Sequence, residues 1–341
     1  MKRDEIKKIL IFKPGAIGDL LHLTPVIRGL NTKFPDARIT LIVGSVISVD
    51  IFRNNPLVNE VIIFSKKGEH RSLPAFAALW SRLRSYHFDL VINYQRSNIK
   101  GWLMMSAAFP CRLLVYHKSR AKLIHAVQDH LKTIEPLGVS SVNRELDLYL
   151  GDEHRRYAAT LFESSCLGKR SVIAINPGAS HPVNRWSTAQ FAALSDRINA
   201  ELDAAVIIVG SGGDSALAHD IERLSSSRPL VLTGTTTLLQ LGAILEKSAL
   251  LISGDTGPMH MATAVRTPVI ALFGAADPER TGPVGAGNRV IQATGLACVP
   301  CRSRTCSAAL RMECMERITV DIVFEAVKEI LAKVNHAYPD C

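Results

Sequence analysis

The sequence predicts an α/β protein made of two doubly wound, Rossmann-like domains. Short apolar runs rich in β-branched residues alternate with helical stretches, and the alternation falters near residue 160 before it restarts at 171. In addition, 341 residues are more than one ordinary hydrophobic core accommodates. We therefore expect two parallel sheets whose strands point their carboxyl ends into a shared cleft, with the two domains facing each other across it.

The first half of the chain contains five runs that read as strands buried on both faces. A helix over about 19–33 follows the first run, and a second helix over about 73–86 precedes the fourth. The charged N-terminal residues lead through a short apolar run directly into a glycine turn, which predicts a first buried strand rather than a signal peptide. We assign residues 1–160 to an N-terminal domain. The five runs are KKILIFK (7–13), RITLIVG (38–44), EVIIFS (60–65), FDLVINY (88–94) and CRLLVYH (111–117).

The second half repeats the pattern and predicts a C-terminal domain over 171–318. An amphipathic helix from about 320 to 334 follows it, and we expect the final segment, 319–341, to pack across the domain boundary. The predicted strands and the turns after them are SVIAINPG (171–178), AAVIIVGSGG (204–213), PLVLTG (229–234), ALLISGD (249–255) and TPVIALFG (267–274).

Composition excludes several classes of protein. Hydrophobic residues make up 47% and charged residues 21%, as in a globular protein and unlike a disordered one. No apolar stretch reaches the roughly 18 residues of a membrane span, so we expect a cytoplasmic protein. The net charge of +9 suggests an anionic partner, although a solubilising surface explains it equally well. Aromatic residues are only 6%, which argues against a nucleic-acid channel.

The loop between the first strand and the first helix, KPGAIGD, is the first candidate site. Gly15 and Gly18 allow a tight turn and a close approach of the backbone to a ligand. Lys13 begins this loop, and Asp19 falls at the start of the helix, where it is either a catalytic carboxylate or a helix N-cap. The glycine spacing is not that of the dinucleotide-binding fingerprint.

The turn SGDTGPMH, which follows a predicted strand and opens a helix, is the second candidate. Asp255, Thr256 and Gly257 lie at the expected helix N-terminus, where free N–H groups and the helix dipole favour an anion. His260 is close enough in sequence to add a donor. The alternative is an ordinary capped turn with a core histidine.

Two more turns after strands could contact phosphate. In NPGAS, Ser180 ends a glycine-containing turn, and Arg185 follows at the edge of the expected cleft. An exposed arginine that only faces solvent is the alternative for Arg185. The glycine-rich turn at 210–214 is more typical of turn chemistry than of a phosphate cradle.

Four cysteines near the C-terminus have the spacing Cys-x2-Cys-x4-Cys-x7-Cys. Such a set is either a structural zinc site or a group of reduced, locally packed thiols. The sequence contains no P-loop, HExxH, GxSxG or Asp-x-Asp motif, so no cofactor and no catalytic metal are expected. The four residues are Cys298, Cys301, Cys306 and Cys314.

Four segments together resemble the heptosyltransferase-like family of bacterial glycosyltransferases, which build the inner core of lipopolysaccharide. They are KPGAIGDLLHLTP, NPGAS with RWS, SGDTGPMHMATA and ALFGAADPERTGP. The resemblance extends from about Lys8 to the C-terminal helix. It implies the two-domain architecture called GT-B, with the acceptor bound by the N-terminal domain and the donor by the C-terminal one.

The resemblance also implies roles for individual residues. Asp19 matches the family's general base, and the family's diphosphate-binding turn matches Asp255, Thr256, Gly257 and His260. Where the family has a phosphate-binding lysine before its tryptophan, this chain has Asn184, with Arg185 next to it. A carboxylate that holds the donor ribose in some members falls near Leu239.

The implied reaction is an inverting, metal-independent transfer from a nucleotide-sugar donor, with ADP-heptose favoured. The acceptor would be a lipopolysaccharide core or related glycolipid, which implies a peripheral position on the inner membrane, and no nucleic acid is involved. Two alternatives remain open: a nucleotide-sugar epimerase or hydrolase, and an inactive sugar-nucleotide-binding protein on the same fold.

Overall fold

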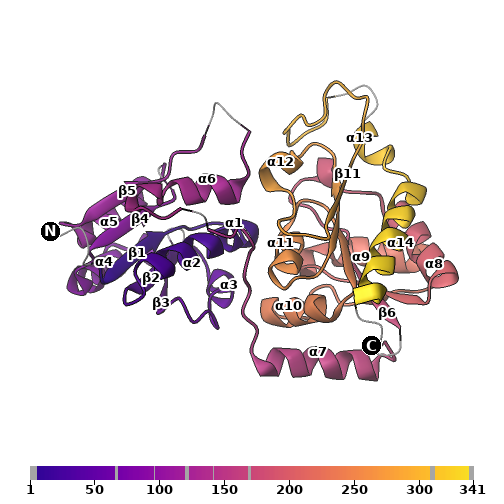
Figure 1. Cartoon of the computed structure of the whole chain (residues 1–341), viewed down its shortest axis with the longest axis horizontal. Helices are drawn as coiled ribbons and strands as arrows, with labels where there is room; N and C mark the ends of the chain where they lie inside the picture. Colours follow the sequence, from indigo (N-terminus) through magenta and orange to yellow (C-terminus); the bar gives the residue numbers. More distant parts are fainter. Residues whose placement is uncertain are drawn as a thin grey trace. The chain divides into compact units, whose positions relative to one another are not determined.

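The chain folds into two compact α/β units, Met1–Tyr149 and Leu150–Cys341. The computed structural model describes residues 6–65, 68–95, 97–119, 123–140, 142–167, 170–307 and 312–337. Each unit contains one sheet with helices packed on it, drawn from indigo to purple for the first unit and from magenta to yellow for the second (Figure 1).

The first unit contains a five-stranded sheet in the order β3-β2-β1-β4-β5. All pairings are parallel, with Ile9 of β1 opposite both Ile39 of β2 and Leu90 of β4. The chain winds outward from β1 to one edge and then returns to build the other, so a topological switch point lies between β1 and β4. The strands confirm the five predicted runs: β1 (Lys8–Phe12), β2 (Arg38–Val43), β3 (Glu60–Ile63), β4 (Leu90–Asn93) and β5 (Arg112–Val115).

Helices cover both faces of this sheet. Leu10 and Phe12 of β1 share a core with Leu79 of α4 and Met104 of α5. Because side chains alternate along a strand, the equally buried Ile9 and its neighbours face the other side, where α2 and α6 contact each other. The helices are α1 (Ile17–Leu21), α2 (Thr24–Lys33), α3 (Val46–Asp50), α4 (Leu73–Tyr86), α5 (Ile99–Met105) and α6 (Ala126–Lys132).

The single helix predicted over 19–33 is wrong, because the chain forms α1 and α2 with a break at His22 and Leu23. Pro25 lies in the first turn of α2, the one place in a helix where its missing N–H is not needed. The Thr24 hydroxyl donates to the Leu21 carbonyl, 2.8 Å away, and so satisfies an end of α1. The helix predicted over 73–86 is confirmed as α4.

The second unit contains a six-stranded parallel sheet in the order β11-β10-β9-β6-β7-β8. Its switch point lies between β6 and β9, which pair through Ile173 and Leu250. The edge strand β11 was not predicted, because its sequence RVIQ mixes polar and apolar residues. The strands are β6 (Ser171–Asn176), β7 (Ala204–Ile208), β8 (Leu230–Val231), β9 (Leu250–Ser253), β10 (Val269–Phe273) and β11 (Arg289–Gln292).

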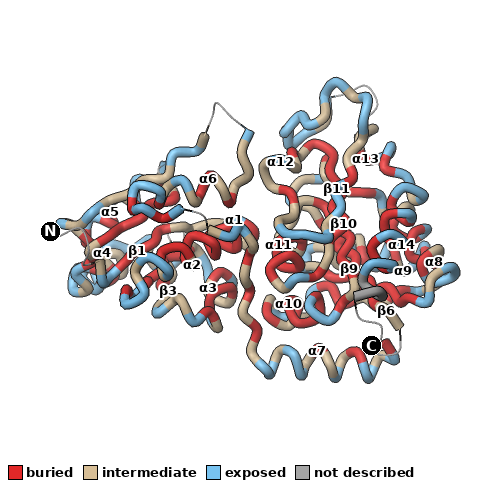
Figure 2. Tube along the Cα trace, viewed as in Figure 1, coloured by how far each residue is buried: buried red, intermediate tan, exposed pale blue. Residues whose placement is uncertain are grey.

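Helices α8, α9 and α14 share the core on one face of this sheet, through Phe191, Ile221 and Phe324. Helix α10 contacts both α11 and α7. Figure 2 shows the central strands of both sheets, among them β4, β6, β9 and β10, as buried and much of the outer surface of the helices as exposed. The helices are α7 (Asp152–Ser164), α8 (Thr188–Glu201), α9 (Ser215–Leu224), α10 (Leu238–Lys247), α11 (Gly257–Ala264), α12 (Pro278–Thr281), α13 (Glu313–Glu316) and α14 (Val320–Ala337).

The division between the units differs from the predicted domain limits. It falls between Tyr149 and Leu150, whereas the sequence placed residues up to 160 in the first domain. Helix α7 belongs to the second unit because it packs on α10, with the Lys247 ammonium 5.6 Å from the centre of the Phe162 ring. Helix α14 packs on α8, β9 and β10, while its predicted contact across the boundary stays a prediction. Residues 1–5 and 338–341 of the predicted segments lie outside the described residues.

Hydropathy and length rule out a membrane-spanning helix anywhere in the described part of the chain.

Candidate active site

The loop after β1, at the switch point of the first unit, brings Lys13, Gly15 and Asp19 together. A Cβ atom on Gly15 would lie 3.1 Å from the Asp19 Cβ and 3.3 Å from the Lys13 Cε. A side chain at this position would press on both Asp19 and Lys13, and glycine avoids this crowding. The Lys13 ammonium lies 3.6 Å from the Asp19 carboxylate, and this ion pair orients the carboxylate.

Asp19 is not a helix N-cap. Ala16 occupies the cap position of α1, and Asp19 is the third residue of the helix, after the buried Gly18. The carboxylate is about half exposed, at 52%, whereas Lys13 is 12% exposed. Asp19 therefore presents an accessible carboxylate at the carboxyl end of β1, as a general base requires.

Asp19 lines an open pocket of about 1060 Å³ formed by the loops after β1, β4 and β5. The β1 loop was found from its glycines, but the β4 and β5 loops carry no motif, and nothing in the sequence indicated that they share a pocket with it. Two lysines and several hydroxyl and amide groups make the pocket suitable for a polar ligand. The lining residues are Lys13, Pro14, Asp19, Tyr94, Gln95, Ser97, Tyr116, His117, Lys118 and Ser119.

A buried histidine packs beside two tyrosines of this pocket. The His130 ring lies edge-on to Tyr94 and Tyr116, with ring centres 5.0 and 5.2 Å apart. Burial, and secondly the nearby Lys13 cation, lower the pKa of His130 to about 4, although Asp19 opposes both. His130 is therefore neutral at pH 7. Burial likewise raises the pKa of Tyr94, so its hydroxyl keeps its proton.

In the second unit, Asn176 joins the two loops at the switch point. It ends β6 and is buried, and its amide nitrogen donates to the Thr256 hydroxyl at 2.9 Å and the Ser253 hydroxyl at 3.2 Å. Its amide oxygen accepts from the Gly178 N–H at 3.2 Å. The sequence did not indicate this role, because an asparagine in an NPG turn already has a local explanation.

The turn after β9 assembles the residues predicted from SGDTGPMH. Thr256 is the backbone N-cap of α11, and Gly257 begins that helix. The Thr281 hydroxyl donates to Asp255 at 2.8 Å, and His260 Nε2 lies 3.7 Å from the same carboxylate. His260 is only 5% exposed and lies against Asp255, as the core-histidine alternative expects, and its contact with a donor stays a prediction. The exposed end of the turn is the N-terminus of α11, which attracts anions.

Arg185 lies beside the loop after β6. The neighbouring Trp186 is buried, and its indole N–H donates to the Ile318 carbonyl at 2.7 Å, which anchors this stretch of chain. One Arg185 nitrogen is 3.4 Å from the Ala179 carbonyl, while its buried Nε has no hydrogen-bond partner within the described residues. Ser180, next to Ala179, is exposed. Arg185 therefore retains a donor for an anion at this loop.

The departures from the family pattern have structural roles. Asn184 Oδ1 accepts a hydrogen bond from the Ala276 N–H at 3.2 Å, so this side chain braces the loop after β10. Leu239 is buried in α10, at 3% exposed, and cannot bind a ribose.

In the glycine-rich turn, the Asp214 carboxylate accepts hydrogen bonds from the Ser211 N–H at 2.9 Å and from the Ser211 hydroxyl at 2.7 Å, which agrees with the predicted turn chemistry.

The four C-terminal cysteines are not arranged around a common metal position in the described part of the chain. Over the described residues, which include all four, no three or more His, Cys, Asp or Glu side chains are arranged to hold an ion. Among the described residues none of the four is in a disulfide, and Cys298 and Cys301 are exposed. Burial raises the pKa of Cys314, and the other three thiols raise it slightly, so the group is gathered locally. The arrangement over the described residues agrees with reduced, locally packed thiols, and zinc binding by this set stays a prediction.

Comparison with known proteins identifies the family. The model of glycosyltransferase family 9 (heptosyltransferase) matches residues 76–311, more than half of the chain. The chain belongs to this family. It is a glycosyltransferase, and its two Rossmann-like units form the GT-B fold.

Relatives of this family member cover most of its length. Lipopolysaccharide heptosyltransferase 3 of Escherichia coli is 29% identical over 76% of this chain and 80% of the relative. Among solved structures, a family 9 glycosyl transferase from Veillonella parvula superposes with a TM-score of 0.85 at 23% identity, covering 96% and 98% of the two chains. Escherichia coli heptosyltransferase WaaC with ADP gives a TM-score of 0.71 at 18% identity, covering 95% and 99%. Both structures are similar in fold.

Proposed function

We propose that this glycosyltransferase moves a heptose or related sugar from a nucleotide-sugar donor to a lipopolysaccharide core or related glycolipid. The observation that supports this best is the pairing of two sites, each at a switch point. The first unit has an accessible carboxylate in a polar pocket, and the second has a helix N-terminus beside an arginine. A transferase that bound its acceptor at the first site and its donor diphosphate at the second would use both.

Asp19 is the proposed general base. As the acceptor hydroxyl attacks the anomeric carbon, the carboxylate takes its proton and the bond from that carbon to the diphosphate oxygen breaks. Attack opposite the leaving group inverts the anomeric centre. Lys13, 3.6 Å from the carboxylate, keeps it in place without blocking it, because half of the Asp19 side chain remains exposed.

Negative charge develops on the departing nucleoside diphosphate, and we propose that groups of the second unit stabilise it. The N–H groups at the start of α11 and the guanidinium of Arg185 are fixed donors that need no reorganisation during the reaction. Asn176 holds the Thr256 turn against the loop after β6, which supports the proposal that donors from both loops bind one diphosphate. Because the sequence has no Asp-x-Asp motif, we propose that these groups replace a metal ion.

ADP-heptose is the proposed donor, and a glycolipid at the cytoplasmic face of the inner membrane is the proposed acceptor. The support for the donor is the family's name together with the solved relative that contains ADP. The net charge of +9 would favour an anionic membrane surface, where such an acceptor is found.

Product analysis tests the reaction type. The protein is incubated with ADP-heptose, with and without lipopolysaccharide core glycolipid, and the products are separated by mass spectrometry. We expect heptosylated glycolipid and free ADP only when both substrates are present. Release of free heptose or conversion of the donor to an epimer, regardless of acceptor, would instead identify a hydrolase or an epimerase. Binding of ADP-heptose without any turnover would identify an inactive binding protein.

A further inference from the structure

The segment Tyr116–Ser119 leaves β5, the edge strand of the first sheet, and forms one wall of the Asp19 pocket. Its last ladder bond runs from the Tyr116 N–H to the Asn93 carbonyl at 2.8 Å. Beyond that point the chain is outside the sheet and belongs to no helix. Something other than the sheet must therefore fix where its side chains point.

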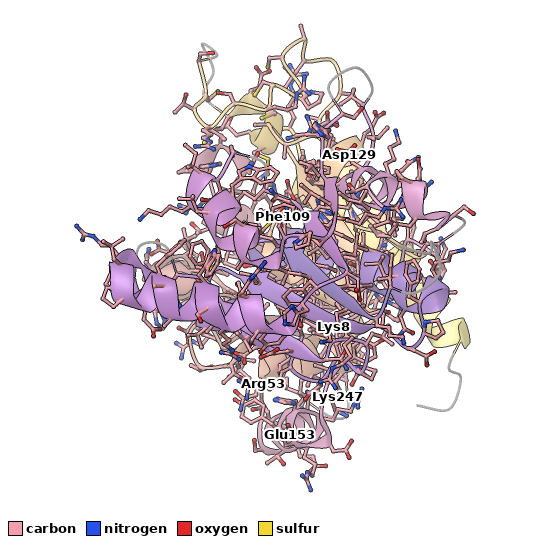
Figure 3. The ribbon with its side chains drawn as sticks, turned by 90° about the vertical axis from the view of Figure 1, so that its left-hand side faces the viewer. Lys8, Arg53, Phe109, Asp129, Glu153 and Lys247 are labelled. Atoms are coloured by element: carbon pink, nitrogen blue, oxygen red, sulfur yellow. The ribbon has the colours of Figure 1, made fainter. Side chains whose placement is uncertain are left out.

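One carboxylate binds both ends of this segment. Asp129 Oδ2 accepts a hydrogen bond from the Tyr116 hydroxyl at 2.6 Å. The same oxygen lies 3.2 Å from the Ser119 N–H, and Oδ1 lies 3.4 Å from it. Asp129 belongs to α6, is labelled in Figure 3 and is 5% exposed. A buried carboxylate is costly unless several donors satisfy it, and here the donors come from the two ends of the pocket wall.

The segment and its neighbours offer the pocket a specific chemistry. Lys118, in the middle of the segment, and Lys13 are cations that line the pocket, and Asp19 is the one carboxylate among the lining residues. Gln95 also lines it, and its buried Oε1 has no partner among the described residues. Such a carbonyl oxygen suits a sugar hydroxyl, and an ammonium suits a carboxylate or a phosphate. The pocket therefore fits a sugar that carries an anionic group.

We propose that Asp129 is a positioning residue for acceptor recognition. It clasps Tyr116 and Ser119 so that Lys118 meets the anionic group of the acceptor sugar while a hydroxyl of that sugar reaches Asp19. This rests on the proposed function in taking the pocket's ligand to be the acceptor. The clasp acts on acceptor binding alone, since donor groups belong to the second unit.

Two variants and a matched control test the clasp. Asp129→Asn keeps the size of the side chain but removes its negative charge and one of its two accepting oxygens, so its hold on the Tyr116 hydroxyl and the Ser119 N–H weakens. Lys118→Met removes the charge and keeps the length. Lys132→Met removes an exposed lysine from α6, the helix that carries Asp129, and serves as the control. Acceptor KM, kcat and donor Kd are measured for each variant.

We expect both Asp129→Asn and Lys118→Met to raise the acceptor KM by about tenfold, the effect of one lost charge-assisted contact. Donor Kd stays unchanged, and kcat at saturating acceptor stays within about threefold. The double variant is no worse than the worse single one, because Asp129→Asn alone already misplaces the lysine. The control behaves like wild type. Acceptor analogues that lack either the phosphate or the carboxylate then identify the anionic group that Lys118 contacts. Removing that group should raise the acceptor KM of wild type but not that of Lys118→Met.

Wild-type acceptor KM in both variants would overturn the clasp. So would an Asp129→Asn protein that loses thermal stability and donor affinity together while Lys118→Met has no effect, because that outcome means a purely structural carboxylate. If the wild-type protein makes no transfer product, the proposed function fails, and the clasp is tested with inorganic phosphate followed by NMR. Phosphate should shift the Ser119 amide signal in wild type and shift it less in both Lys118→Met and Asp129→Asn. An absent shift in wild type refutes the anion site, and an equal shift in Asp129→Asn refutes the clasp.

Discussion

The buried imidazole of His130 should make the first unit sensitive to acid. Its pKa is about 4, below the ordinary value of 6.5, chiefly because burial disfavours the charged ring and secondly because Lys13 is nearby. Asp19, Asp129 and a hydrogen bond with the His22 backbone act in the opposite direction, and the edges of Tyr94 and Tyr116 complete the environment.

The magnitude follows from the two pKa values. Between pH 6.5 and pH 4 the unfolded chain binds a proton at this histidine and the folded chain does not. The stability due to neutral His130 is fully present above pH 6.5 and is lost as the pH falls through this window. The gap between the two pKa values corresponds to about 3 kcal/mol of unfolding free energy for the first unit.

Urea unfolding at a series of pH values, followed by pulsed hydrogen exchange and mass spectrometry, resolves the two units. Peptides from β1 and β4 report on the first unit, and peptides from β6 and β9 report on the second. His130→Gln removes the titrating ring, so the stability of its first unit should fall less steeply with acid than that of wild type. The second unit should respond identically in both proteins and is the internal control. Equal slopes for the first unit would refute the assignment of a neutral, buried His130.

Three further predictions concern catalysis. Transfer should survive EDTA, because in the proposed mechanism the helix N–H groups and Arg185 do the work of a metal ion at the diphosphate. Loss of activity on chelation that magnesium or manganese reverses would contradict this. Arg185→Ala should weaken donor binding by about 10- to 100-fold in calorimetry. Arg185→Lys should restore only part of this affinity, because lysine lacks the Nε donor. An unchanged donor Kd in both variants would mean that Arg185 is only a surface charge. Gly15→Ala should lower kcat by at least about tenfold at constant donor Kd, because the added methyl group displaces Asp19. A wild-type kcat would contradict this and would mean that the loop accommodates the methyl group without moving Asp19.

Strand pattern predicted most of the fold, because strands buried on both faces leave a strong local signal. ILIF within KKILIFK and VIAIN within SVIAIN are buried throughout, and each run became a central strand. The sequence pattern mispredicted the elements whose structure depends on their neighbours in the fold rather than on their own composition. RVIQ forms β11 only because β10 offers an edge, and α7 belongs to the second unit only because α10 covers its apolar side. Pro25 was a local signal that should have divided the helix predicted over 19–33.

The candidate site was predictable only where glycine or a helix N-terminus marked it. Asp19 and Thr256 follow such markers, so the sequence found both. Gln95, Lys118 and Asp129 come from loops and a helix with no motif, and only the sheet order places them beside β1. A role that depends on tertiary neighbours rather than on local spacing leaves no trace in a single sequence.

The central claim is that Asp19 removes the acceptor proton, and Asp19→Asn tests it most directly. Steady-state transfer from ADP-heptose to core glycolipid is measured for wild type, for this variant and for Asp36→Asn, an exposed aspartate of the same unit. We expect Asp19→Asn to lower kcat by about 10²- to 10⁴-fold while calorimetry gives an unchanged donor Kd, and we expect Asp36→Asn to match wild type. An Asp19→Asn enzyme with kcat within about threefold of wild type would contradict the claim.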